Sequence, residues 1–258
     1  MTGRQLHELR APQVAESITE SSVIVLPVGA IEQHGPHLPL STDLLIAEEL
    51  CERVVAERGE ELDLWLLPPL AFTKSNEHAW APGTVWLSAT TMLAVLDDIG
   101  RSLSTLSAKR LVFVNGHGGN TALLTVANRD LRFAHDLMTF LMHPRQPRDS
   151  GGASDADELG MGIHGGRDET AMVLYLRPEL VDMSLAVRSI PDEMDERQHV
   201  KFGGDVPFGW LANDLSANGA IGDPTLATAE LGKTLVDGAV QQLGESLAEV
   251  ASFEFPVT

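Results

Sequence analysis

The stretch SVIVLPVGAIEQHGPHLPLSTD, residues 22–43, joins a strongly apolar run to a cluster of side chains that can bind metals. Its first part, residues 22–28, is rich enough in Val, Ile and Leu to predict a buried β-strand. Its second part supplies two carboxylates and two imidazoles, which are Glu32, His34, His37 and Asp43. Such groups are costly to gather beside a core unless something binds them, so the stretch predicts a metal ion at the end of a buried strand.

Strands and helices are expected to alternate along the rest of the chain. Periodicity predicts further strands at residues 64–67, 111–115 and 137–142, and helices at 44–58, 89–107, 121–135, 168–176 and 224–250. Asp43, Ser88 and Asp223 are interpreted as helix N-caps. This order predicts an α/β fold with three α/β/α layers around a mainly parallel central sheet. Because no linker is visible, we expect a single domain spanning residues 1–258.

Composition restricts the partners of the protein. The 258 residues carry a net charge of −19, which makes nucleic acid and anionic membranes poor partners. The single cysteine, Cys51, excludes an intrachain disulfide and a thiolate metal cluster. No apolar run approaches the ~20 residues that span a bilayer, and the N-terminus has no apolar signal core. A cytoplasmic protein is therefore expected.

Polar residues follow every predicted strand. In open parallel sheets, ligands bind beyond the carboxyl ends of the strands, so these residues should meet at one edge. A set of two histidines and three carboxylates from separate loops suits two divalent ions, and zinc, manganese and iron(II) accept such mixed nitrogen and oxygen ligands. The residues that follow the four strands are Glu32, His34, His37 and Asp43; Ser75, Glu77 and His78; His117; and His164 and Glu169.

Each of these residues taken alone has a simpler explanation. Glu32 and His34 face the same way in an extended segment, which suits two ligands or a hydrogen-bonded pair. Asp43 alone is better explained as a helix cap. His117 lies in the glycine-rich segment NGHGGN, which is also typical of a tight strand-to-helix turn. Glu169 is stabilised by a helix dipole whether or not it binds an ion.

Two further assignments stay open. His37 and His78 are interpreted as supporting residues rather than metal ligands. The long loop at residues 143–163 contains the segment GGASDADE, residues 151–158, which is either a lid over the site or a solvated insertion.

Six segments together resemble the creatininase family of metal-dependent amidohydrolases. The resemblance runs from residue 29 to about residue 225, and it implies a creatininase-like α/β/α fold, two adjacent divalent ions and a homo-oligomer, often a hexamer. The segments are GAIEQHGPHLPLSTD (29–43), SNEH (75–78), PGT (82–84), NGHGGN (115–120), HGGRDET (164–170) and GDPT (222–225).

The resemblance also implies a role for individual residues. Glu32, Asp43 and His117 would hold one ion, and His34, Asp43 and Glu169 would hold the other, with Asp43 bridging. A water or hydroxide between the ions would be the nucleophile, and His164 would be the acid that protonates the leaving amine. The positions expected to contact the substrate are Ser75, His78 and Gly118.

The chain also departs from creatininases proper. In those enzymes the histidine of the fourth segment is followed by tyrosine and glutamate, where this chain has Gly118 and Gly119. No tryptophan lies between Trp86 and Trp210, the region expected to enclose creatinine. Creatinine is therefore not the expected substrate. Residues 220–229 are similar to the branch that trims the mycofactocin precursor peptide, which implies a short peptide substrate. Other branches with the same glycine-rich segment imply a cyclic amide or a formamide instead.

Two other functions are compatible with parts of the sequence. The missing glutamate at Gly119 allows a non-catalytic ligand-binding or assembly protein of the same fold. The pattern of a strand, glycines and a helix allows a nucleotide-binding domain. However, the turn at residues 116–119 lacks both the spacing of a dinucleotide fingerprint and a phosphate-loop lysine.

Overall fold

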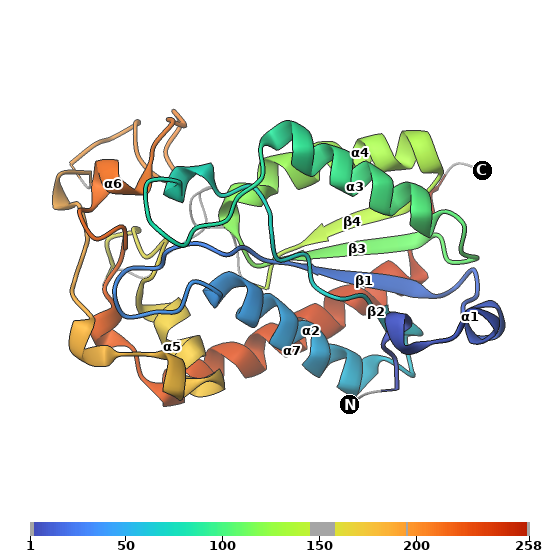
Figure 1. Cartoon of the computed structure of the whole chain (residues 1–258). Coiled ribbons are helices and arrows are strands. Elements are labelled where there is room, and N and C mark those ends of the chain that lie inside the picture. The colour runs from blue at the N-terminus through green and yellow to red at the C-terminus, as the bar shows by residue number, and fades with distance from the viewer. Residues whose placement is uncertain (1–2, 145–157, 195, 257–258) are drawn as a thin grey trace.

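The computed structural model describes residues 3–144, 158–194 and 196–256, and a four-stranded parallel sheet forms its centre (Figure 1). The strands are β1 (Val23–Val28), β2 (Leu64–Leu66), β3 (Arg110–Asn115) and β4 (Met138–Met142), in the spatial order β2-β1-β3-β4. All three pairings are parallel. The carboxyl ends of the strands therefore meet at one edge of the sheet.

Helices cover both faces of the sheet, which confirms the predicted three-layer α/β/α fold. On one face lie α2 (Thr42–Arg58), α5 (Arg167–Leu176) and α7 (Ala229–Ser252), and on the other lie α3 (Ala89–Leu103) and α4 (Thr121–His135) (Figure 1). Two short helices, α1 (Ala11–Ser17) and α6 (Ala212–Leu215), were not predicted. Within the described ranges, no helix is both long and apolar enough to span a bilayer.

The middle strand β1 is apolar throughout because both of its faces are buried. Val23 and Val25 of β1 pack into one hydrophobic cluster with residues of α2, α5 and α7. Ile24 and Leu26 point the other way, into a second cluster with residues of α3 and α4. This alternation is the period of two expected of a strand.

Leu50, in the middle of α2, gives a direct test of this packing. It is fully buried in the cluster beneath the sheet, so Leu50→Ala should lower the free energy of unfolding by about 2–5 kcal/mol. Val126→Ala, at a position on α4 that is 47% exposed, should change it by less than about 0.5 kcal/mol. Urea unfolding followed by circular dichroism measures both variants, and equal midpoints would contradict this description of the core.

Three local predictions are corrected by the structure, and one is confirmed. Ser88 is confirmed as an N-cap, because its side chain accepts a hydrogen bond from the Thr91 amide. The helix predicted to start at residue 224 is a 3-10 turn, Pro224–Leu226, followed by α7. Asp223 caps only that turn, and Thr228 caps α7.

Asp43 is not an N-cap, because α2 begins at Thr42 and the carboxylate lies in its first turn. Its side chain makes no capping contact and faces the end of the sheet instead. The loop interpreted as a lid or an insertion falls mostly at residues 145–157, which lie outside the described residues.

Candidate metal centre

The segments that follow the strands bring their acidic and imidazole side chains together at the carboxyl edge of the sheet. Among the described residues there are three groups, and within each group the ligand atoms all lie within 4.8 Å of one another. Two of them are the sets that the family resemblance implies, and the third adds His164 to the candidates. The groups are Glu32, Asp43 and His117; His34, Asp43 and Glu169; and Glu32, His34 and His164.

Glu32 lies at the centre of this arrangement. Its Oε2 accepts a hydrogen bond from the hydroxyl of Ser75. Its Oε1 is buried without a hydrogen-bond partner among the described residues. Burial is the largest influence on this carboxyl group and raises its pKa to about 7. Four imidazole nitrogens surround Oε1, at 3.3 Å (His117 Nδ1), 3.5 Å (His78 Nε2), 3.6 Å (His164 Nδ1) and 3.9 Å (His34 Nε2).

Asp43 faces two histidines with its two oxygens. Oδ1 lies 3.1 Å from Nε2 of His34, and Oδ2 lies 3.2 Å from Nδ1 of His117. Within the described part of the chain, Oδ2 is also buried without a hydrogen-bond partner. Buried, unsatisfied carboxylate oxygens that face ring nitrogens are costly, and a divalent cation would satisfy them. The residues present therefore fit a metal ion.

Hydrogen bonds on the far side of each ring orient the two candidate histidine ligands. His34 donates from Nδ1 to the backbone carbonyl of Glu32 at 3.1 Å, which turns Nε2 towards Asp43. His117 donates from Nε2 to the backbone carbonyl of Lys74 at 3.0 Å, which turns Nδ1 towards both carboxylates. Such bonds fix the ring orientation that a metal ligand needs.

The carboxylates and histidines of the centre shift one another's pKa values. Burial lowers the pKa of His34, but the Asp43 and Glu32 carboxylates outweigh it and raise that pKa to about 9. Burial also lowers the pKa of His117, but the nearby carboxylates, Glu32 first among them, outweigh it and raise that pKa well above its usual value. Burial raises the pKa of Asp43, but His34 and His117 outweigh it and lower that pKa well below its usual range. A bound cation would replace the protons that these rings hold.

His164 contacts two other imidazole rings, stacking on His78 and lying tilted against His34. Its ring centroid is 4.2 Å from that of His34 and 4.1 Å from that of His78. It donates from Nε2 to the backbone carbonyl of Gln33 at 2.6 Å, which leaves Nδ1 facing Glu32. Burial, followed by repulsion from His78, lowers the pKa of His164 well below its usual value, and burial lowers the pKa of His78 to about 3. Both rings are therefore neutral near pH 7.

The substrate-contact positions expected from the sequence lie at the same edge of the sheet. Ser75 and His78 are buried beside Glu32, and both point polar atoms at its carboxylate. Gly118 begins a 3-10 turn, Gly118–Asn120, directly after His117. His37 interacts with Thr170 of α5 through Nε2 at 2.9 Å, which is a supporting contact.

Gln33 was missed by the sequence reasoning. Its side-chain amide donates to Nδ1 of His78 at 2.8 Å and to the carbonyl of Gly219 at 3.1 Å, and its backbone carbonyl holds His164. The alternation of an extended segment predicts that residue 33 points away from its neighbours Glu32 and His34. No sequence pattern therefore marks it.

Glu77 occupies the space left by the glycine at position 119. A Cβ added to Gly119 would overlap Oε1 of Glu77, so the two positions share one volume. Burial raises the pKa of Glu77, but His117 and Lys74 outweigh it and lower that pKa to about 2. Glycine at position 119 therefore leaves the space that this carboxylate occupies, on the Nε2 side of the His117 ring.

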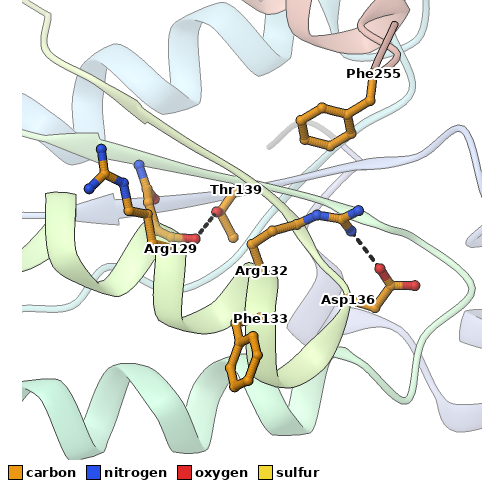
Figure 2. Close-up of a pocket in the computed structure, with 7 residues that line it drawn as sticks. Arg129, Arg132, Phe133, Asp136, Thr139 and Phe255 are labelled. Carbon is orange, nitrogen blue, oxygen red and sulfur yellow. Dashed lines mark hydrogen bonds and ion pairs between the residues drawn. The ribbon is translucent and has the colours of Figure 1, made fainter. Parts of the chain in front are cut away.

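A pocket of about 560 Å³ lies at the opposite edge of the sheet, away from the candidate metal centre (Figure 2). It is formed by the last turns of α4, the start of β4 and Phe255. Its single carboxylate, Asp136, accepts a hydrogen bond from Arg132 at 2.5 Å. Its lining contains no histidine, so the carboxyl edge remains the candidate site.

Comparison with known proteins gives a consistent result. The family model for creatininase, creatinine amidohydrolase, matches residues 7–247. The mycofactocin precursor peptide peptidase of Mycolicibacterium smegmatis is 34% identical over 243 residues, which cover 91% of this chain and 83% of that protein.

Two solved structures of creatininase, a manganese form and a mutant of the Zn-Zn type, each superpose with a TM-score of 0.74. They are 27% and 26% identical to this chain, and the matches cover 97% of it and 99% and 100% of those chains. The fold and the site define a metal-binding hydrolase with three α/β/α layers. The chain belongs to the creatininase family of amidohydrolases, and it is a hydrolase that acts on carbon–nitrogen bonds.

Proposed function

We propose that this protein is a dinuclear metal hydrolase that cleaves an amide bond of a short peptide. One ion would be held by Glu32, Asp43 and His117, and the other by His34, Asp43 and Glu169. The observation that carries the proposal is the position of Asp43, whose two oxygens lie 3.1 and 3.2 Å from nitrogens of different histidines. A carboxylate in this position can bridge two cations.

The chemistry follows from this arrangement. Paired divalent ions, when bound, lower the pKa of a water towards ~7 and stabilise the oxyanion that forms at the attacked carbonyl. Zinc and manganese are the proposed ions, because similar creatininase structures have Zn-Zn and Mn forms. Iron(II) accepts the same ligands and is the alternative.

His164 is the proposed proton carrier. Its Nε2–H is engaged by the Gln33 carbonyl, so Nδ1 is the atom that exchanges protons with the reacting groups. Because the ring is neutral, it first accepts a proton from the attacking water and then delivers it to the leaving nitrogen as the C–N bond breaks. Gln33 and the stacked His78 ring hold it in place for both transfers.

The relatives support a peptide substrate. The mycofactocin precursor peptide peptidase is more similar in sequence to this chain, at 34%, than the creatinine amidohydrolase of Pseudomonas putida, at 29%. Gly118 and Gly119 stand where creatininases proper have a tyrosine and a glutamate, so this chain lacks the aromatic side chain expected to face creatinine. A small cyclic amide or a formamide is the alternative substrate. A homo-oligomer such as a hexamer is the proposed assembly.

Metal removal tests the proposed function. Dialysis against a chelator should reduce hydrolysis to the uncatalysed rate, and added zinc or manganese should restore it. Elemental analysis should find about two ions per chain, and a panel of short peptides, cyclic amides and formamides identifies the substrate. Turnover that continues unchanged in metal-free protein would refute the proposal.

A non-catalytic ligand-binding or assembly protein of the same fold is the alternative function. It depends on the missing glutamate at position 119, whereas Glu169 completes a ligand group with His34 and Asp43. It would gain support if the metal-loaded protein bound members of the panel and hydrolysed none.

A further inference from the structure

The outer side of the His117 ring contacts a buried carboxylate with no assigned role. Nε2 of His117 lies 3.3 Å from Oε1 of Glu77, in addition to its contact with the Lys74 carbonyl. Glu77 is only 8% exposed, and its other oxygen, Oε2, accepts a hydrogen bond from Nζ of Lys74 at 2.8 Å. Lys74, Glu77 and His117 therefore form a chain of contacts that ends at the candidate metal centre.

The contact between Glu77 and His117 depends on the absence of a side chain at Gly119. A side chain at residue 119 would begin inside the volume of Oε1 of Glu77, and its Cβ would lie 2.5 Å from Nε2 of His117. Neither approach is possible for real atoms. Glycine at position 119 is therefore what allows the Glu77 carboxylate to reach the ring.

We propose that Glu77 is a positioning residue for His117, and that Lys74 and Gly119 hold it in that role. By sharing the Nε2–H with the Lys74 carbonyl, the carboxylate helps to keep Nδ1 facing Glu32 and Asp43 and makes that nitrogen a stronger metal ligand. Loss of such a carboxylate partner costs about 10–100-fold in metal affinity in comparable sites. The inference rests on the proposed function, because it assigns His117 to a metal.

A simpler interpretation is that Glu77 only forms an ion pair with Lys74. The chain offers a matched pair for comparison, Arg58 and Glu61, which has the same spacing of three residues and a distance of 2.7 Å. That pair lies at the far end of α2 and contacts no candidate ligand. If Glu77 only paired with Lys74, removing either glutamate would leave metal affinity unchanged.

The test measures the affinity of the metal-free protein for zinc by competition with a chromophoric chelator. We expect Glu77→Ala to weaken binding by about 10–100-fold. Glu77→Gln should give a smaller loss, because its amide oxygen still accepts the Nε2–H but carries no charge. Glu61→Gln should bind zinc as the wild type does. Circular dichroism of each metal-free variant establishes that it is folded, and Glu77→Gln keeps the shape of the buried side chain if Glu77→Ala does not fold.

The outcomes separate the two proposals. If the wild type binds no zinc, the proposed function fails. If the wild type binds zinc and folded Glu77 variants bind it equally tightly, only the positioning role of Glu77 is refuted. Gly119→Ala gives an independent check, since displacing the carboxylate should also weaken zinc binding, and unchanged affinity in that variant would count against the inference.

Discussion

Asp43→Asn is expected to give a folded protein that no longer retains two ions and that hydrolyses its substrate at least ~10⁴-fold more slowly. Both oxygens of Asp43 face histidines that serve different ligand groups. Asparagine would place an NH₂ group, which cannot bind a cation, against one of them. The loss should be large because the water that attacks the amide depends on both ions.

Elemental analysis and kcat of the purified variant measure this effect. Asp97→Asn is the matched control, since Asp97 also pairs with a histidine, at 2.8 Å from Nε2 of His135, but on the surface of α3. That variant should keep its metal content and its rate. An Asp43→Asn protein that retains two ions and the wild-type rate would remove the basis of the dinuclear assignment.

His164→Gln should reduce kcat by about 10²–10⁴-fold, the range for a lost proton-transfer group, while the metal content stays at the wild-type level. Glutamine is close to histidine in size and keeps a polar side chain in the stack, but it cannot carry a proton between water and the leaving nitrogen. Substrate affinity should change less than kcat, because the proton is transferred only during bond cleavage.

The His164→Gln variant also tests whether His164 is a metal ligand. Because Nδ1 of His164 lies 3.6 Å from Glu32 and belongs to a possible ligand group, His164 could instead hold a metal. A fall in both kcat and zinc content would show that it is a ligand and not the proton carrier. His135→Gln, outside the site on α4, controls for the general effect of removing an imidazole.

Local patterns predicted the elements of the sheet well. The apolar run after Ser22 and the run at residues 111–115 both form strands buried on two faces, because few arrangements other than the middle of a parallel sheet bury such runs. Helix starts were harder to place. Asp43 and Asp223 both have cap-forming side chains, but neither caps the helix predicted for it, since a cap is decided by where backbone hydrogen bonding begins.

The candidate site was less accessible from the sequence. Glu32 and His34 could be found because they follow a recognisable strand. Gln33 and Glu77 could not be assigned roles, because their contacts come from segments far along the chain. Gln33 reaches Gly219, 186 residues away, and Glu77 lies against His117 in the turn after β3.

The sequence by itself determined which chemistry is available, because it sets which side chains follow each strand. It also indicated the edge of the sheet where they collect, since parallel strands all end at the same edge. Only the tertiary structure decided the distances. The order β2-β1-β3-β4 puts β1 beside β3, so the segment with Glu32 and the turn with His117 become neighbours across a single strand pairing. Packing of α5 against α2 then brings Glu169 to Asp43. Such proximity depends on how whole elements bury their apolar faces, which no single stretch of sequence encodes.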